Sequence, residues 1–416
     1  MTRKVWIVSH YAMPPHLEMR VKTLRFAQYL QDVGYDVLLI TASTIHNTDI
    51  NLIQDKSLYI EKEYDGLKFV HIKCNQYNGS RIKRIINLYQ FQYNFCKVMK
   101  NFDKPEVILA DCNCINYSGI YKFASKNNIP FISEIRDLWP LSIVEYLHFR
   151  NNNPIIRYLY SREKKMYKVS NAIIFSMEGG KDYLINKGWD KSINLNKVFN
   201  INNGIDINQV KQSEIDNVLE DKELLDDKFK IIYTGSIRQV NDIGKILDVA
   251  KEVKSRGLDD IRFIIYGDGD QKDELQKRVI DEKIDNAVFK GFVQKKYIPY
   301  ICSKANVNII NVVPSILTQY GASWNKLFDY MAARKPILST LKVKYDLIDR
   351  YDCGISTQDQ SVSTIANAIE ELYNMPKDKY QQMCDNAWKG AECYDFKTLT
   401  AKLQEVIEYA IINDKK

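Results

Sequence analysis

Short apolar runs alternate with helical patterns along the chain, and this alternation limits the possible folds more than any other feature of the sequence. Such alternation is typical of βαβ units, in which helices connect the parallel strands of one sheet. In the first half we expect strands at 5–9, 36–41, 68–72, 106–110, 130–134, 172–175 and 197–201. We expect helices between most of them, at 20–33, 82–99, 117–126 and 154–167.

A polar, acidic segment at 208–228 interrupts the alternation, which then starts again. The second series predicts strands at 230–234, 262–266, 287–290 and 307–312, and helices at 243–254, 272–280 and 297–303. At 416 residues the chain is also longer than one hydrophobic core usually organises. We therefore predict an α/β protein with two Rossmann-like, doubly wound domains, 1–207 and 229–390, joined by a linker at 208–228. The last segment, 391–416, is amphipathic, and we expect its helix to pack back on the first domain.

The composition excludes several classes of protein. The 59 basic and 52 acidic residues give a net charge of +7, which is too small for the dense basic stripe of a nucleic-acid-binding protein. The eight cysteines form no CxxC pair, and no histidine lies at zinc-ligand spacing from them. The sequence has no stretch as apolar as a membrane span and no signal-peptide core. We therefore expect a reduced, cytoplasmic protein that binds no nucleic acid.

The stretch 321–336, GASWNKLFDYMAARKP, combines polar residues with the start of an apolar helix. Asn325 and Lys326 lie where that helix begins, and the helix N-terminus offers unpaired N–H groups and a positive dipole end to a phosphate. Asp329 lies one helical turn further in, where a carboxylate can hold sugar hydroxyls. This pairing predicts a nucleotide-sugar site.

Three glycine-bearing segments follow predicted strands in the second half, at the edge where open parallel sheets bind ligands. The first, 233–238, contains Gly235, Ser236 and Arg238, whose guanidinium group suits a diphosphate. The second is 266–270, with Gly267, and the third is 290–294, with Phe292 and Val293. Each segment alone is weak evidence, because a glycine after a strand is more often a plain turn.

The order of the four segments, GSIR, YGDGD, KGFV and NKLFDY, resembles the nucleotide-binding domain of retaining glycosyltransferases of the family 4 type. In the first half, FISEIRDLWP at 131–140 is similar to a segment of a bacterial subgroup that builds surface polysaccharides. The resemblance implies two facing Rossmann-like domains, the GT-B fold. It also implies transfer of a sugar, often an N-acetylated amino sugar, from a UDP-sugar to a glycan or polyprenyl-linked acceptor, with no catalytic metal.

The resemblance also implies roles for residues by their position. Asp329 corresponds to the second glutamate of a paired-glutamate motif and would bind the donor ribose, whereas the first glutamate falls on Gly321 and is absent. A lysine expected near Asn241 is absent too, which leaves Arg238 as the better diphosphate anchor, with Lys245 as a weaker second. Further candidates are Lys326 and Asn325 for the diphosphate, and Gly267, Phe292 and Val293 for the base.

In the first half, Asp137 is our candidate for orienting the acceptor, with Arg136 beside it as a second catalytic candidate. The alternative for these two residues is a structural ion pair. The loop after the first strand contains His16 and Arg20, which we predict to bind the acceptor because the loop resembles the family's first strand-end loop in position.

The helix predicted at 81–100 is basic and amphipathic, so it could lie on an anionic membrane surface. The alternative is a helix that faces the core and has a solvated basic edge. Two other functions remain open for the chain as a whole. One is a UDP-N-acetylglucosamine 2-epimerase with the same architecture. The other is a non-catalytic binding subunit, an alternative that the absence of the first glutamate supports.

Overall fold

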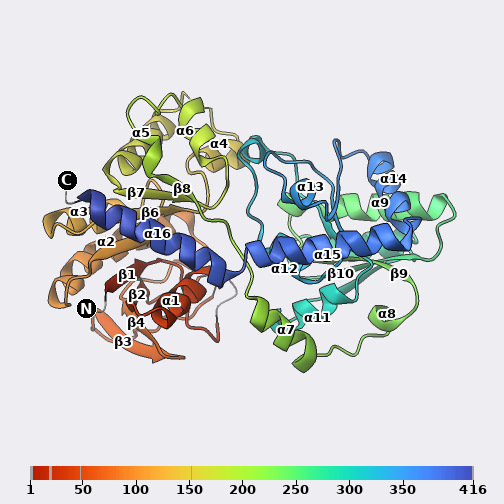
Figure 1. Cartoon of the computed structure of the whole chain (residues 1–416), viewed down its shortest axis with the longest axis horizontal. Helices are drawn as coiled ribbons and strands as arrows, with labels where there is room; N and C mark the ends of the chain where they lie inside the picture. Colours follow the sequence, from red (N-terminus) through yellow and green to blue (C-terminus); the bar gives the residue numbers. More distant parts are fainter. Residues whose placement is uncertain (1–2, 18–20, 47, 151, 415–416) are drawn as a thin grey trace. The chain divides into compact units, whose positions relative to one another are not determined.

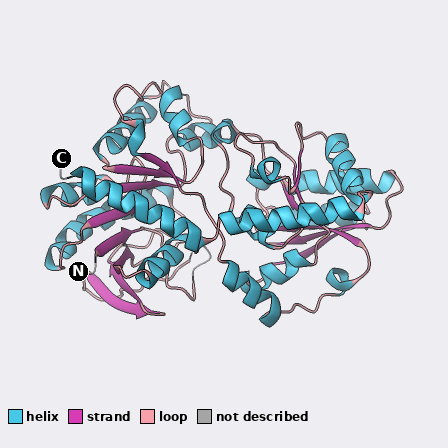
Figure 2. Ribbon diagram, viewed as in Figure 1, coloured by secondary structure: helices cyan, strands magenta, loops and turns pink. Residues whose placement is uncertain are grey.

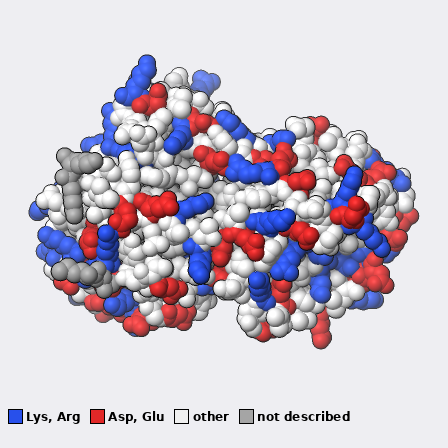
Figure 3. Space-filling model, in the orientation of Figure 1, with Lys and Arg blue, Asp and Glu red and all other residues white. Residues whose placement is uncertain are grey.

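The computed structural model describes residues 3–17, 21–46, 48–150 and 152–414. The chain divides into two compact units (Figure 1). The first comprises Met1–Asn202 and Phe396–Lys416, and the second comprises Asn203–Asp395. Over most of the surface in view in Figure 3, basic and acidic side chains are interspersed. No helix among the described residues is both long enough and apolar enough to cross a membrane.

The first unit contains an eight-stranded sheet with the order β3-β4-β2-β1-β5-β6-β7-β8. All neighbouring strands are parallel except β3 and β4, which form a hairpin through Asp65 and Gly66, both with positive φ. We did not predict β3, because its outward-facing residues are polar and carry no apolar alternation. The strands are β1 (Lys4–Val8), β2 (Asp36–Ala42), β3 (Tyr59–Tyr64), β4 (Leu67–Ile72), β5 (Val107–Asp111), β6 (Phe131–Ile135), β7 (Ala172–Phe175) and β8 (Val198–Asn200).

Seven α-helices described in the first unit cover this sheet (Figure 2). The last, α16, follows the second unit in the chain but contacts α1 and the strands β5, β6 and β7. Two aromatic contacts hold it there, between Phe26 and Phe396 at 5.8 Å and between Phe199 and Tyr409 at 5.1 Å. The helices are α1 (Lys22–Asp32), α2 (Arg81–Val98), α3 (Ser118–Lys126), α4 (Leu141–Leu147), α5 (Pro154–Val169), α6 (Gly180–Asn186) and α16 (Phe396–Asp414).

The second unit contains a six-stranded parallel sheet with the order β11-β10-β9-β12-β13-β14. Its strands are buried on both faces, because Ile231 and Phe263 belong to one apolar cluster and their neighbours Ile232 and Ile264 belong to another. The strands are β9 (Phe229–Thr234), β10 (Ile261–Tyr266), β11 (Ala287–Gly291), β12 (Val307–Ile310), β13 (Ile337–Ser339) and β14 (Gly354–Ser356). The helices are α7 (Ile207–Asp216), α8 (Lys222–Leu225), α9 (Ile243–Ser255), α10 (Lys272–Asp281), α11 (Ile298–Ser303), α12 (Asn325–Ala332), α13 (Leu347–Tyr351), α14 (Val362–Tyr373) and α15 (Lys377–Cys393).

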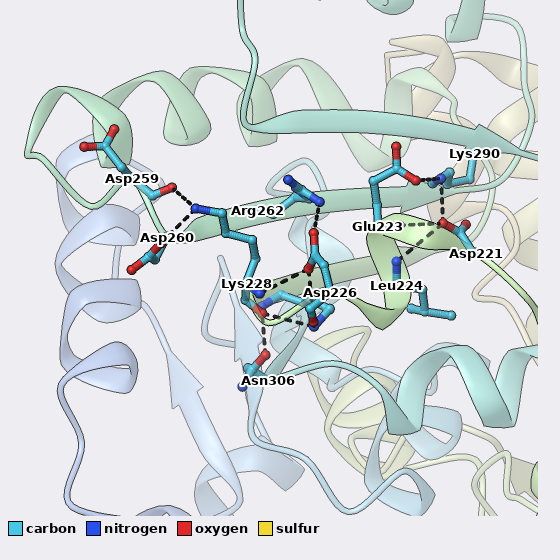
Figure 4. A network of polar contacts seen from close by, with 11 residues as sticks. Asp221, Glu223, Leu224, Asp226, Lys228, Asp259, Asp260, Arg262, Lys290 and Asn306 are labelled. Carbon is cyan, nitrogen blue, oxygen red and sulfur yellow. Dashed lines mark hydrogen bonds and ion pairs between the residues drawn. The ribbon is translucent and has the colours of Figure 1, made fainter.

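The segment that we predicted as a linker, 208–228, belongs to the second unit and contains most of α7 and all of α8. Its acidic residues bind basic side chains of the sheet (Figure 4). The Nζ atom of Lys290 lies 2.7 Å from Asp221 Oδ1 and 2.6 Å from Glu223 Oε2. Asp226 forms an ion pair with Arg262 of β10. The acidic composition that made this segment look like a linker therefore serves to attach it to the sheet.

Candidate functional site

The three glycine-bearing segments of the second unit lie side by side at the carboxyl edge of the sheet. The Gly235 N–H group donates to the carbonyl oxygen of Tyr266 at 3.0 Å, and the Gly267 N–H group donates to the carbonyl oxygen of Gly291 at 2.8 Å. The contact between Gly235 and Gly267 requires glycine, since a Cβ atom on Gly267 would lie 1.8 Å from the Gly235 carbonyl oxygen. The sheet order reverses at β9, between β10 and β12, which is where open α/β sheets bind ligands.

Helix α12 begins beside this edge. Its residue Tyr330 accepts a hydrogen bond from the backbone N–H group of Thr234 at 2.8 Å, which ties the helix to the end of β9. The N-cap residue, Trp324, gives no side-chain hydrogen bond to the first turn, and Asn325 is exposed. The Leu327 N–H group donates to the Trp324 carbonyl oxygen at 3.1 Å, but the N–H groups of Asn325 and Lys326 have no acceptor among the described residues and are available to an anion.

Lys326, in the first turn of α12, is held in place by two polar contacts. Its Nζ atom donates to the Tyr233 hydroxyl oxygen at 3.1 Å and lies 3.4 Å from Asn241 Oδ1. No carboxylate of the described residues forms an ion pair with Lys326. Burial without such a partner lowers the pKa of Lys326 to about 7. The site thus contains a positioned lysine whose charged form a bound anion would stabilise.

Asn241 occupies the place where the resemblance led us to expect a lysine. Its side-chain N–H₂ group donates to the carbonyl and hydroxyl oxygens of Ser236, at 2.8 and 2.9 Å. The Oδ1 atom of Asn241 faces the Nζ atom of Lys326. A lysine side chain therefore lies next to position 241, but it comes from α12. We did not predict the roles of Tyr233 and Asn241 in holding Lys326. The spacing from Gly235 pointed to position 241, but we interpreted Asn241 only as the absence of an expected lysine.

Asp329 lies one turn after Lys326 and is partly buried. No described residue donates a hydrogen bond to its carboxylate. Burial raises the pKa of Asp329, while the charge of Lys295 acts in the opposite direction. A partly buried carboxylate without a protein donor is suited to accept hydrogen bonds from ligand hydroxyl groups.

The remaining predicted residues of this unit lie around the same edge. Arg238 and Ser236 are exposed, and no described residue accepts a hydrogen bond from the Arg238 guanidinium group. Phe292 is exposed after β11, whereas Val293 packs against the apolar cluster that contains Leu224. The structure therefore brings the predicted residues of the second unit to one edge of the sheet, and their roles stay predictions.

The loop before α12 contains Gly321, where the first glutamate of the family motif is absent. Gly321 has φ +84°, and a Cβ atom there would lie 3.2 Å from the carbonyl oxygen of Lys344. Ser323 is held by Asn203, whose backbone N–H group donates to Ser323 Oγ at 2.8 Å and whose side chain donates to the Ser323 carbonyl oxygen at 2.5 Å. These contacts hold the backbone of the loop next to the start of α12.

In the first unit, Arg136 belongs to a cluster of buried charges. Its Nη2 atom donates to Glu134 Oε2 at 2.9 Å and to Thr23 Oγ1 at 2.7 Å, and its Nε atom lies 3.5 Å from Asp111 Oδ2. Lys22 pairs with Glu134 at 2.8 Å. Burial acts to raise the pKa of Glu134, but Arg136 and Lys22 lower it to about 2. Arg136 therefore has a clear structural role, and its predicted catalytic role is untested.

The other predicted residues of the first unit are at the surface or outside the described residues. Asp137 is exposed, and so is His16, whose ring centroid lies 6.1 Å from that of Tyr64. Arg20 lies outside the described residues. Within the part of the chain that the structure describes, no group of three or more His, Cys, Asp or Glu side chains is arranged to hold a metal ion.

A family model described as "Glycosyl transferases group 1" matches residues 228–375, a range that includes the glycine segments and α12. A comparison with curated protein sequences finds no significant match.

Solved structures resemble nearly the whole chain. Sucrose-phosphate synthase from Thermosynechococcus elongatus has 13% identity and a TM-score of 0.72, and the likeness covers 98% of each chain. The Anabaena protein HepE, solved in complex with UDP and glucose, has 13% identity, a TM-score of 0.67 and coverage of 98% and 99%. WaaG, a glycosyltransferase involved in lipopolysaccharide biosynthesis, has 12% identity, a TM-score of 0.63 and coverage of 97% and 99%. At these identities the likeness shows the fold, which is GT-B.

Proposed function

We propose that this chain, a glycosyltransferase with the GT-B fold, transfers a sugar from a UDP-sugar to a hydroxyl group of a glycan or lipid-linked acceptor in the synthesis of a cell-surface polysaccharide. The transferred sugar is an N-acetylated amino sugar or a related hexose, and its anomeric configuration is retained. The sugar and the stereochemistry come from the resemblance of the NKLFDY and RDLWP segments to family 4 enzymes. UDP as the nucleotide is supported by the complex of HepE with UDP.

The observation that carries the proposal is the arrangement of Lys326 and Asp329 in the first turns of α12. Lys326 is a positioned cation without a carboxylate partner among the described residues, next to the uncapped N-terminus of the helix. Asp329 is a carboxylate without a protein donor among the same residues. A nucleotide diphosphate followed by a ribose presents two matching groups, an anion and a pair of vicinal hydroxyls.

This arrangement would assist departure of the UDP leaving group. As the bond between the anomeric carbon and the diphosphate oxygen breaks, negative charge increases on the diphosphate. Lys326 in its protonated form and the N–H groups of the first turn are placed to stabilise that charge. Arg238, which is exposed near Gly235, supplies a second cation to the same group. The acceptor hydroxyl then bonds to the anomeric carbon on the face from which UDP departs, and its proton passes to the departing diphosphate oxygen.

The first experiment compares thermal stability with UDP, GDP, ADP and a panel of UDP-sugars, because a ligand that binds the folded state raises its melting temperature. We expect UDP compounds to give the largest shifts. The Lys326→Met variant should lose most of that shift, whereas Lys277→Met, which changes an exposed lysine of α10, serves as the control and should keep it. A chain that binds no nucleotide would contradict the proposal. Conversion of UDP-N-acetylglucosamine without an acceptor, seen by NMR, would identify an epimerase instead.

We also propose that helix α2 contacts an anionic membrane surface. Its outward face carries large exposed apolar side chains, at Ile82, Ile85, Ile86, Tyr89 and Tyr93. Residues 81–98 contain no Asp or Glu but include four basic residues. An exposed apolar stripe on a helix whose charged residues are all basic suits an anionic lipid surface.

Flotation with vesicles that contain phosphatidylglycerol tests this contact. We expect the wild-type chain to float with these vesicles at low salt and the Ile82→Asp variant to remain in solution. Ile82 is 73% exposed, and Ile280 in α10 is 75% exposed, so Ile280→Asp is a matched control that should float like the wild type. Equal flotation of all three proteins would contradict a contact through α2.

A further inference from the structure

The first unit contains a second positioned guanidinium group, at the carboxyl edge of its own sheet. The sheet order reverses at β1, which lies between β2 and β5, so ligands are expected beyond the ends of β1 and β5. Tyr11 follows β1 and packs against a cluster that contains Cys114 and Ile115, which follow β5. Arg84, from the first turns of α2, reaches the same place.

Two contacts with Tyr11 fix the Arg84 side chain. The Nε atom donates to the Tyr11 hydroxyl oxygen at 2.8 Å, and the guanidinium carbon lies 5.1 Å from the centroid of the Tyr11 ring. These contacts leave both terminal nitrogens, Nη1 and Nη2, without an acceptor among the described residues. A guanidinium group that is held on one side and open on the other is well suited to bind a carboxylate or phosphate through two parallel hydrogen bonds.

No carboxylate of the described residues neutralises Arg84. Among the described residues it forms no ion pair, and α2 contains no acidic residue over Arg81–Val98. Arg84 is nevertheless partly buried, whereas its neighbour Lys83 is exposed. A cation that is partly removed from water without a counter-charge is stabilised by an anionic ligand.

The rings of His10 and His46 lie next to the Tyr11 ring. The His10 side chain is 3% exposed, and its ring packs edge-on against the Tyr11 ring at 4.6 Å. Burial lowers the pKa of His10 to about 3, so this ring is neutral. The His46 ring lies 4.7 Å from the Tyr11 ring, and its Nδ1 atom is 2.5 Å from the Tyr77 hydroxyl oxygen. Of these rings, the Tyr11 ring is the one that lies against the Arg84 guanidinium group.

We propose that Arg84, held by Tyr11, forms a subsite that binds an anionic group of the acceptor, a phosphate, diphosphate or carboxylate. The inference rests on the proposed function, because it assigns the acceptor side of that reaction. It makes Arg84 a specificity-determining residue, since neutral acceptors would leave its terminal nitrogens without a partner.

Isothermal titration in the presence of saturating UDP tests the subsite, because UDP fills the diphosphate site of the second unit. The probes are inorganic pyrophosphate, N-acetylglucosamine 1-phosphate, farnesyl phosphate and glucuronate, which separate phosphate, sugar phosphate, lipid phosphate and carboxylate. We expect at least one probe to bind the wild-type chain and the Arg84→Gln variant to bind it at least tenfold more weakly. Arg84→Lys should fall between them, because it keeps the charge and loses the planar fork. Lys83→Gln is the matched control and should bind like the wild type.

Three outcomes would overturn the subsite: no probe binds the wild-type chain, Arg84→Gln binds as tightly as the wild type, or Lys83→Gln loses as much affinity as Arg84→Gln. The last would indicate a diffuse basic surface. UDP affinity is measured separately in each variant and should not change. If UDP itself fails to bind, the proposed donor site is wrong, while the comparison of Arg84→Gln with Lys83→Gln can still be made without UDP.

Discussion

The ammonium nitrogen of Lys326 lies 3.1 Å from the hydroxyl oxygen of Tyr233, and it also lies 4.5 Å from the centroid of the Tyr233 ring. Tyr233 is fully buried and donates its own hydroxyl proton to the carbonyl oxygen of Ser236 at 2.9 Å. The lysine thus has a neutral hydrogen-bond acceptor and an aromatic face, but no carboxylate among the described residues. This arrangement holds a cation in position while leaving its charge available to a ligand.

Binding of a UDP-sugar should therefore take up a proton. The pKa of Lys326 is about 7 in the free chain, and the negative diphosphate should raise it in the complex. Above pH 7 the free lysine is largely neutral and the bound lysine is charged. We expect affinity to fall as pH rises from 7 to 9, by at most about tenfold per pH unit.

Calorimetry in two buffers with different ionisation enthalpies measures this proton uptake directly. The Lys326→Met variant should bind more weakly and should show no proton uptake at pH 8. Identical apparent enthalpies for the wild-type chain in both buffers would show that Lys326 does not change its protonation on binding.

Gly267→Ala should destabilise the second unit strongly. The new Cβ atom would lie 1.8 Å from the Gly235 carbonyl oxygen, and φ at this residue is +150°, so we expect a cost of more than about 2 kcal/mol. Gly257→Ala is the control, because its φ is also positive, at +78°, but the space around it is open. It should cost about 1 kcal/mol. Urea denaturation compares the two, and equal costs would mean that the contact of Gly267 with Gly235 is unimportant.

Glu163 should make the stability of the first unit depend on pH. It accepts hydrogen bonds from Tyr167 at 2.7 Å and Tyr183 at 2.9 Å, and burial raises its pKa to about 8, against an ordinary value of 4.5. Between these values the folded chain holds a proton that the unfolded chain has released. The contribution of Glu163 to stability is therefore complete below pH 4.5 and is lost as pH rises to 8.

Glu163→Gln removes this titration. We expect the free energy of unfolding of the variant, relative to the wild type, to rise between pH 5 and pH 8. Glu405→Gln, at an exposed position of α16, should leave the pH dependence unchanged. Parallel pH profiles for the wild type and Glu163→Gln would contradict the raised pKa.

Lys290→Met should weaken the attachment of α8 to the sheet (Figure 4). The change leaves Asp221, whose side chain is 10% exposed, without its cation, and we expect a cost of about 1–3 kcal/mol. Lys228→Met removes the ion pair with Asp260, which is exposed to solvent, and should cost less than about 1 kcal/mol. Chemical denaturation of both variants provides the comparison. A larger loss for Lys228→Met would reverse our ranking of the two ion pairs.

The strands and helices could be predicted where their apolar pattern is strong. The buried strands at 5–9 and 262–266 and the helix at 154–167 appear in the structure within a few residues of the predicted bounds. We did not predict the hairpin strand β3, because its residues are partly or fully exposed to solvent and show no apolar alternation. The segment 208–228 was misread for a related reason. Ion pairs connect it to strands that lie far away in the chain, and no local pattern reveals such partners.

The sequence by itself determined the two βαβ series and the order of the glycine segments and the NKLFDY helix, because periodicity and spacing are properties of the chain. Only the tertiary structure decided which groups are left without partners. Among the residues that the structure describes, it placed Lys326 against Tyr233 and Asn241 with no carboxylate partner, held Arg136 between Glu134 and Thr23, and left the terminal nitrogens of Arg84 without an acceptor beside Tyr11. The physical reason is that the protonation and the partners of a charged side chain depend on its burial and on residues far away in the chain. Both are set only when the chain has folded.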